Sequence, residues 1–353
     1  MTRDGPIDER LELLRSWLQP LSGDYGLRLE TLRPASSDAS FRRYFRIDAQ
    51  ATRQGERHAA SYVAMDAPPP HEDCRPFVQV ARLLARHGVS TPEIIASDIE
   101  AGFLLLSDLG NTTYADALVQ PDADVAALYA DALTALVRLQ QARPDFTLPA
   151  YDEQRLLSEM RLFPEWYLAR HLGKELTASE SRVLESSFER LVEAASSQSQ
   201  VLVHRDYHCR NLMVLPSPQR NPGVLDFQDA VVGPITYDLV SLLRDAYVEW
   251  SETQQLDWAA RYWEIARGVG LPVPERFDVF WRDIEWMGLQ RSLKVLGIFA
   301  RLCYRDGKNR YLADLPLVLR HTQRVVERYS AFSGLACLLD RVHERTPQSG
   351  LTF

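Results

Sequence analysis

The sequence has few of the features that mark exported, membrane-spanning or nucleic-acid-binding proteins. Its four cysteines lie far apart among 353 residues, so neither a disulfide framework nor a zinc site is indicated. No run of about 18 or more apolar residues occurs, which argues against a transmembrane helix. The first residues lack the apolar stretch of a signal peptide, so we expect a cytoplasmic protein. A net charge of −8 argues against nucleic acid as a partner.

The composition is that of an ordinary globular protein. Hydrophobic residues make up 46% of the chain and charged residues 25%, with no low-complexity tract. A length of 353 residues exceeds what one hydrophobic core usually serves. We therefore expect two lobes, with a cleft between them as the natural place for a ligand.

The pattern of apolar residues changes along the chain. After a first amphipathic helix at 7–18, the β-prone stretches LRLETL, FRRYFRI, SYVAM and FLLLSDL surround one helix at about 74–87. Beyond Leu109-Gly110 the pattern is mainly helical, at about 123–142, 153–171, 177–197, 253–268, 275–302 and 315–331. This predicts an α+β fold with a small sheet lobe, 1–107, and a larger helical lobe, 108–353.

Residues 201–243 carry the chemistry. Their sequence is VLVHRDYHCRNLMVLPSPQRNPGVLDFQDAVVGPITYDLVSLL, in which short apolar strands lead to Asp206, follow Asn211 and end at Asp226. Phosphoryl transfer from ATP needs a carboxylate to orient the acceptor hydroxyl and oxygen ligands to hold Mg²⁺ against the phosphates. Asp206 therefore fits the base, and Asn211 and Asp226 fit the metal ligands.

The pattern H-x-D-x-x-x-x-N, followed by a strand that ends in Asp-Phe, resembles the signature of the protein-kinase-like superfamily. Within it, the chain is similar to the aminoglycoside phosphotransferase and choline kinase group, which also matches at Asp108-Leu109-Gly110 and Tyr237-Asp238-Leu239. The resemblance implies a bilobal kinase-like fold with an antiparallel sheet in the small lobe and ATP bound between the lobes.

The same resemblance implies roles for individual residues around the nucleotide. The loop from Ser37 to Arg43, including Ser40, would cover the phosphates, and His208 would face the γ-phosphate, a role that Arg210 could also serve. Adenine would bind the backbone around three residues at the lobe junction: Leu106, Ser107 and Asp108. His204 and Asp238 are interpreted as anchors of the catalytic loop, Asp238 also as a helix cap, and Cys209 as a small filler.

A narrower likeness concerns the acceptor. The segments SSDASFRRYFRI, VAMDAPPP, HRDYHCRNLM and GLQRSLKVLGIFARL resemble the bacterial N-acetylmuramate/N-acetylglucosamine kinases of peptidoglycan recycling, which phosphorylate the anomeric hydroxyl. This implies a small amino-sugar substrate, and we expect a monomer. Five residues are candidates for the acceptor pocket: Glu165, Trp166, Gln290, Arg291 and Lys294. For the last three, a solvent-exposed face or an ion pair explains the sequence equally well.

One departure from the kinase pattern leaves alternatives open. Kinases have V-A-I-K where this chain has Val63-Ala64-Met65-Asp66, so the lysine that grips the phosphates is missing. Arg43 or Arg46 could supply that charge, or Mg²⁺ and backbone amides suffice. A nucleotide-binding pseudokinase remains an alternative, as does a kinase for another small acceptor such as an aminoglycoside, choline or homoserine.

Overall fold

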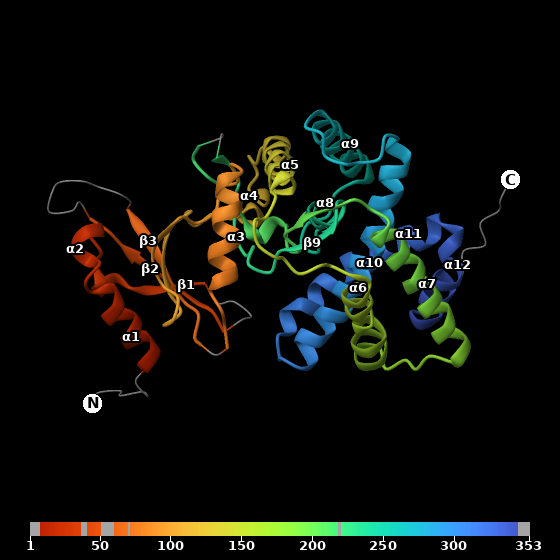
Figure 1. Cartoon of the computed structure of the whole chain (residues 1–353). Helices are drawn as coiled ribbons and strands as arrows, with labels where there is room; N and C mark the ends of the chain where they lie inside the picture. The colour runs from red at the N-terminus through yellow and green to blue at the C-terminus, as the bar shows by residue number, and fades with distance from the viewer. Residues whose placement is uncertain (1–7, 37–40, 51–59, 70, 218–219, 345–353) are drawn as a thin grey trace. The chain divides into compact units, whose positions relative to one another are not determined.

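The computed structural model describes residues 8–36, 41–50, 60–69, 71–217 and 220–344. The chain forms two compact units, shown in Figure 1. The first consists of Met1–Thr112 and Met213–Asp229, and the second of Thr113–Leu212 and Ala230–Phe353. The sequence analysis placed 213–229 with the helical lobe, whereas here this segment clusters with the first unit. Asp226 consequently belongs to the first unit, and Asp206 and Asn211 to the second.

The first unit is built on a five-stranded antiparallel sheet with strand order β1-β2-β3-β5-β4. Its strands are β1 (Arg33–Ser36), β2 (Arg43–Asp48), β3 (Ser61–Asp66), β4 (Ile94–Asp98) and β5 (Phe103–Ser107). Its helices are α1 (Glu9–Leu18), α2 (Ser22–Tyr25) and α3 (Arg75–Arg86). The strand predicted at LRLETL is wrong, because Leu29–Thr31 forms a 3₁₀ turn and the strand begins at Arg33.

One face of this sheet packs on α1. Side chains alternate between the two faces along each strand, and the register pairs Phe45 with Ala64 and Arg43 with Asp66. Leu14 and Leu18 of α1 are completely buried against Phe45, Ala64 and their neighbours. Arg43 and Asp66 therefore lie on the face toward α1, while Arg46 points to the opposite face.

The second unit is mainly helical, as the sequence predicts. Its helices are α4 (Tyr114–Leu118), α5 (Val125–Gln141), α6 (Glu153–Met160), α7 (Ala178–Ser196), α8 (Tyr237–Leu243), α9 (Glu252–Gly268), α10 (Phe277–Tyr304), α11 (Leu315–Arg328) and α12 (Ser333–Val342). The helix predicted at 153–171 is interrupted, because a π-helix occupies Phe163–His171. Ser251 and Gln254 form a capping box at the start of α9.

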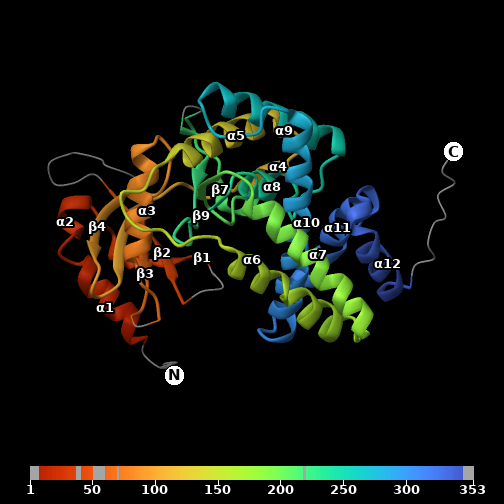
Figure 2. The ribbon, with the colours of Figure 1, turned by 45° about the vertical axis from the view of Figure 1, so that its right-hand side comes forward.

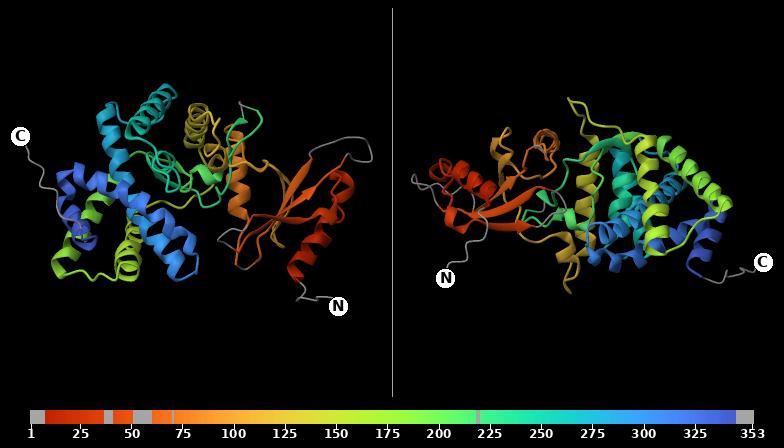
Figure 3. Two further views of the ribbon diagram at one scale, coloured as in Figure 1. Left: turned by 180° about the vertical axis from the view of Figure 1, so that it is seen from behind. Right: turned by 90° about the horizontal axis from the view of Figure 1, so that it is seen from below.

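Helix α10 is the central element of this unit (Figure 2). It packs against α7, α8, α11 and the π-helix, while α5 and α9 lie side by side (Figure 3). The approach to the π-helix is close at Gly297, where an added Cβ would lie 2.4 Å from the carbonyl carbon of Leu162. Only glycine fits there without a shift of backbone. In the part of the chain that the structure describes, no helix is both long and apolar enough to cross a bilayer.

Candidate active site

Two short strand pairs deliver the candidate catalytic residues. Strand β6 (Gln200–Val203) pairs with β9 (Val231–Pro234) in antiparallel register and leads directly into the loop 204–211. Strand β7 (Leu212–Met213) follows that loop and pairs with β8 (Gly223–Val224), which precedes Asp226. The three strands predicted around this motif are therefore present, and β9 is an addition that the sequence did not reveal.

Buried carboxylates anchor the catalytic loop by accepting hydrogen bonds from its backbone. Asp238 is fully buried and accepts hydrogen bonds from the backbone N–H groups of His204 at 2.6 Å and Arg205 at 2.9 Å. The predicted anchoring role of Asp238 is thus confirmed. Its predicted role as a helix cap is wrong, because its carboxylate faces the loop and Thr236 occupies the N-cap of α8. Burial raises the pKa of Asp238 to about 7, although these two hydrogen bonds act in the opposite direction.

A second carboxylate, which the sequence analysis did not single out, completes this support. Asp245 accepts a hydrogen bond from the backbone N–H of Cys209 at 2.9 Å and is itself fully buried. Cys209 is also buried, and burial raises the pKa of its thiol. A protonated, inaccessible thiol is no nucleophile, which agrees with its interpretation as a filler.

His204 is a structural residue, as the sequence suggested. It is almost completely buried, and its Nδ1 accepts a hydrogen bond from the backbone N–H of Asp206 at 3.2 Å. Arg205 adopts a left-handed backbone conformation with φ of 79°, unusual for a residue with a side chain. Anchors on both sides of Asp206 keep the loop in this conformation, and strained residues of this kind cluster at functional sites.

The Asp206 carboxylate lies in a strongly positive environment. Burial by itself would raise the pKa of this carboxyl group, but the positive charges of Lys294 and Arg291 outweigh burial and lower it. Asp206 is therefore ionised at neutral pH and ready to accept a hydrogen bond from a hydroxyl group. For His208 the main effect is burial, which lowers the pKa, so its ring is neutral under the same conditions.

Lys294 belongs to a buried polar cluster beside Asp206. Its ammonium group lies 3.0 Å from the Glu159 carboxylate and donates a hydrogen bond to the Tyr237 hydroxyl at 2.9 Å. Arg205 donates to the other oxygen of Glu159 at 2.7 Å, and Tyr151 also hydrogen-bonds to this carboxylate. The cluster links α6, α10 and the catalytic loop, so the position of Asp206 depends on it. The sequence analysis missed Glu159 because no motif in its own segment indicates a functional role.

The two candidate metal ligands can be judged from their own surroundings. The side-chain nitrogen of Asn211 donates to the carbonyl oxygen of Asp206 at 2.9 Å, so its amide oxygen is the atom suited to a cation. Asp226, in the first unit, has a left-handed backbone with φ of 62°, and its carboxylate accepts a hydrogen bond from Gln228 at 2.7 Å. No cluster of three or more His, Cys, Asp or Glu residues suited to a metal occurs among the described residues. Carboxylate and amide oxygens are each of the type that Mg²⁺ accepts as ligands.

The predicted nucleotide residues of the first unit lie around the end of β5. Leu106 is buried in the sheet, and the backbone N–H of Ser107 donates a hydrogen bond to the backbone carbonyl oxygen of Glu93. Asp108 accepts two hydrogen bonds from Arg46, at 2.6 and 2.9 Å, and one from the Ser61 hydroxyl at 2.6 Å. This network fixes the segment that follows β5. The predicted phosphate-loop residues Ser37 and Ser40 lie outside the described residues.

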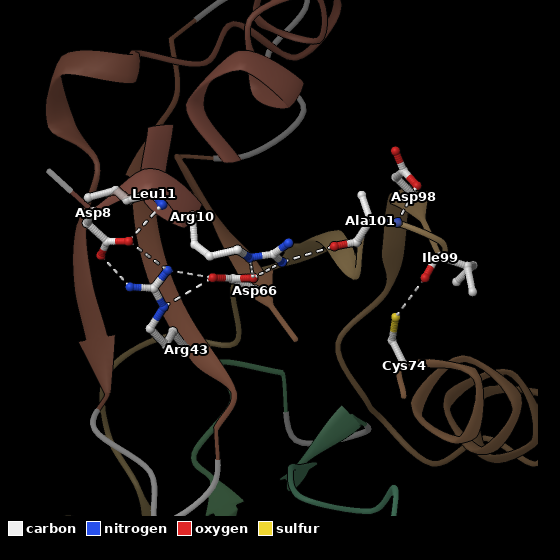
Figure 4. Close-up of polar contacts among 9 residues, drawn as sticks. All are labelled: Asp8, Arg10, Leu11, Arg43, Asp66, Cys74, Asp98, Ile99 and Ala101. Atoms are coloured by element: carbon white, nitrogen blue, oxygen red, sulfur yellow. Dashed lines mark hydrogen bonds and ion pairs between the residues drawn. The ribbon is translucent and has the colours of Figure 1, made fainter. Parts of the chain in front are cut away.

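Arg43 belongs to an ion-pair network on the face toward α1 (Figure 4). The Asp66 carboxylate, completely buried, binds Arg43 at 2.6 Å and also pairs with Arg10. Arg43 further pairs with Asp8, whose carboxylate caps the start of α1. Asp66, in the segment aligned with the kinase lysine motif, thus joins the first helix to the sheet.

The candidate acceptor residues differ in their surroundings. Gln290, Arg291 and Lys294 are all buried on α10, so the solvent-exposed interpretation of these three residues is wrong. Lys294 is ion-paired, whereas the Nε atom of Arg291 is buried and lacks a hydrogen-bond partner among the described residues. Glu165 is exposed and Trp166 half-buried on the π-helix. Arg210 stacks on the Tyr247 ring, with its guanidinium carbon 3.4 Å from the ring centre.

This fold and this catalytic loop are those of a phosphotransferase, and comparison with known proteins agrees. Residues 31–279 match the phosphotransferase enzyme family, and the chain belongs to this family. It is 45% identical over 343 residues to the N-acetylmuramate/N-acetylglucosamine kinase of Neisseria meningitidis serogroup B, covering 96% of this chain and 98% of that one. A protein of the same name from Pseudomonas aeruginosa is 51% identical over 308 residues, 87% of each chain.

Solved structures confirm the predicted kinase-like fold. ADP-bound aminoglycoside phosphotransferase APH(2'')-Ib superimposes with a TM-score of 0.56 at 16% identity, covering 90% of this chain and 99% of that one. A choline/ethanolamine kinase family protein from Mesorhizobium loti gives a TM-score of 0.60 at 13% identity, covering 94% and 99%.

Proposed function

We propose that this chain is an ATP-dependent kinase that transfers the γ-phosphoryl group to the anomeric hydroxyl of N-acetylmuramate or N-acetylglucosamine. The observation that carries the proposal is the Asp206 carboxylate, kept ionised by surrounding positive charge on a loop anchored by Asp238 and Asp245. The names of the curated relatives, which match nearly the full chain, support the choice of acceptor. We further propose that the enzyme is a cytoplasmic monomer.

Asp206 would act by orientation more than by basicity. An ionised carboxylate accepts a hydrogen bond from the acceptor hydroxyl and directs its oxygen toward the γ-phosphorus. The transition state of phosphoryl transfer is loose, so the proton leaves the hydroxyl late and a strong base is unnecessary. A lowered pKa at Asp206 therefore suits this role.

Asn211 and Asp226 are the proposed ligands of Mg²⁺. Bound there, the ion would neutralise charge that develops on the phosphates during transfer. Asn211 contributes its amide oxygen, because its nitrogen is committed to the carbonyl of Asp206. His208, neutral and next to the catalytic carboxylate in the same loop, is proposed to donate a hydrogen bond to the γ-phosphate.

Arg291 is the proposed partner of the acceptor's carboxylate. N-acetylmuramate carries a lactyl carboxylate that N-acetylglucosamine lacks, and Arg291 is a buried cation close enough to Asp206 to influence its pKa. Lys294 is less suited, since Glu159 already neutralises it. Glu165 and Trp166 remain proposals for contacts to the sugar ring.

A coupled ADP-release assay tests the proposal. We expect turnover with N-acetylmuramate and N-acetylglucosamine, and none above background with choline, an aminoglycoside or homoserine. Phosphorus NMR of the product should show an ester at the anomeric position. Turnover with one of the other acceptors alone would assign a different kinase activity. ATP binding without turnover of any acceptor would instead identify a pseudokinase.

A further inference from the structure

Helix α11, in the second unit, carries a stripe of arginines along one face. Arg320, Arg324 and Arg328 follow one another at intervals of four residues, so each lies one turn from the next. Like charges at this spacing repel each other and destabilise a helix unless other groups neutralise them. The two outer arginines have such partners, since Arg320 pairs with Glu249 at 2.7 Å and Arg328 pairs with Glu252 at 2.6 Å.

The middle arginine is not neutralised in this way. Arg324 forms no ion pair with a carboxylate among the described residues. Its side chain is half-buried, and its Nη1 atom is enclosed without a hydrogen-bond partner in that part of the chain. An enclosed donor on a charged group is costly unless an acceptor reaches it. Arg324 therefore lacks the kind of partner that its two neighbours on α11 have.

His321 lies one turn from Arg324 on the same helix and also lacks a partner. It is 3% exposed, and neither of its ring nitrogens has a hydrogen-bond partner among the residues that the structure describes. Burial, followed by the charges of Arg244 and Arg324, lowers the pKa of this histidine, so both guanidinium groups lie near its ring. A neutral imidazole carries one N–H, so His321 can donate a hydrogen bond without being protonated.

The start of α9 lies alongside the same arginines. Ser251 caps this 17-residue helix, and the carboxylates on either side of the cap, Glu249 and Glu252, bind the two outer arginines of α11. The segment 249–252 consequently runs along the stripe, with Arg324 between its two ends. The N-terminus of a helix carries partial positive charge and attracts anions. A second source of positive charge therefore lies next to Arg324.

The charged groups linked to His321 and Arg244 do not balance. Arginines outnumber carboxylates by one among them: Arg244, Arg320, Arg324 and Arg328 against Glu249, Glu252 and Glu285. We propose that Arg324, His321 and the N-terminus of α9 form a binding site for a small oxyanion, such as phosphate or a phosphate monoester. The guanidinium group holds two of its oxygens, and His321 donates a hydrogen bond to a third. None of these residues belongs to the catalytic loop or to the predicted nucleotide and acceptor residues.

Calorimetric titration of the full chain with inorganic phosphate, at an ionic strength held constant with chloride, tests this inference. We expect Arg324→Gln to weaken phosphate binding at least about 10-fold, because a charge-assisted contact is lost. Arg324→Lys keeps the charge without the two-pronged geometry and should bind with intermediate affinity. Arg182→Gln removes an exposed arginine of α7 and, as the matched control, should leave the affinity unchanged.

Thermal melts separate a binding site from a structural role. Without phosphate, Arg324→Gln should melt at the temperature of the wild type or above it, since the variant relieves repulsion between the arginines of α11. Added phosphate should raise the melting temperature of the wild type more than that of the variant. A variant that melts lower and binds phosphate as the wild type does would show that Arg324 only supports the fold.

Acetate and glucose 1-phosphate, titrated in parallel, distinguish the possible sources of the oxyanion. Binding that depends on Arg324 supports the site and identifies a carboxylate or a sugar phosphate as its ligand. If none of the three anions shows binding that depends on Arg324, the proposal is overturned. If Arg324→Gln does not fold, His321→Leu decides, because it removes a donor to the anion but no hydrogen bond of the described chain. Its expected loss of affinity is about 2- to 10-fold.

Discussion

The Lys294 ammonium lies 3.0 Å from the Glu159 carboxylate, and Glu159 in turn accepts a hydrogen bond from Arg205, the residue before the candidate base. The side chains of Lys294 and Glu159 are 8% and 13% exposed. The positive charge that lowers the pKa of Asp206 most strongly is therefore also part of the framework that positions it.

Lys294→Met should damage both stability and turnover. Glu159 loses one of its two cations, and removing one member of a buried ion pair costs about 3 kcal/mol of unfolding free energy. We expect kcat to fall about 10- to 100-fold, because an electrostatic contribution to the site is removed. Urea denaturation and steady-state kinetics measure the two effects. The double variant Lys294→Met with Glu159→Gln should regain part of the stability without regaining turnover, and an unchanged midpoint in the single variant would contradict the cluster's role.

Asp206→Asn should abolish phosphorylation while leaving nucleotide binding nearly unchanged. The amide keeps the shape of the side chain but cannot accept the hydroxyl proton, so we expect kcat to fall at least about 1,000-fold. Stopped-time ADP assays and calorimetric titration with ATP measure these quantities. Turnover close to that of the wild type would refute the assignment of Asp206.

The buried side chain of His321 should make the folded protein less stable in mild acid. Burial, followed by the charges of Arg244 and Arg324, lowers the pKa of this histidine from 6.5 to about 3. The unfolded chain then binds a proton that the folded chain excludes, so stability is complete above pH 6.5 and declines as the pH falls from there toward 3. Between pH 6.5 and 4.5 this group should cost about 2 kcal/mol.

His321→Leu supplies the control for that experiment. Neither ring nitrogen has a hydrogen-bond partner among the described residues, so leucine removes no hydrogen bond. Urea unfolding at several pH values should show that this variant loses about 2 kcal/mol less stability than the wild type between pH 6.5 and 4.5. A profile parallel to that of the wild type would show that His321 does not carry the effect.

Gly297→Ala should destabilise the second unit. The new methyl group would lie 2.4 Å from the backbone of Leu162, so α10 and the π-helix must separate. We expect a loss of about 2 kcal/mol, typical of an overpacked contact. Gly268→Ala is the matched control, since an added Cβ there meets no atom within 4 Å. It should be neutral or slightly stabilising, and similar thermal melts for the two variants would contradict the steric argument.

The catalytic loop could be predicted because its functional residues lie close together in the sequence. His204, Asp206 and Asn211 need only the local spacing to be recognised, and the strands around them follow from short apolar runs. Their supports are distant in sequence: Glu159 is 46 residues from Arg205, and Asp245 is 36 residues from Cys209. A single sequence does not reveal such pairs, because the residue type alone does not show whether a carboxylate is buried or which group it contacts.

The sheet lobe was predicted less completely. LRLETL alternates like a strand, but its backbone bonds within a 3₁₀ turn and Leu27 makes only an isolated bridge to Ala49. The long helices of the second unit were located well, since each presents several turns of regular apolar spacing. The interruption at Phe163–His171 was not visible, because apolar spacing does not distinguish a π-helix from an α-helix over two turns.

The left-handed conformation of Arg205 costs less than the ion pair of its side chain contributes. Glycine at this position would relieve about 1 kcal/mol of conformational cost, but it would also remove the guanidinium that ties the loop to Glu159. Because loss of one cation from the buried Glu159 costs about 3 kcal/mol, more than glycine relieves, libraries sorted for thermal resistance and for phosphorylation should both retain arginine at residue 205.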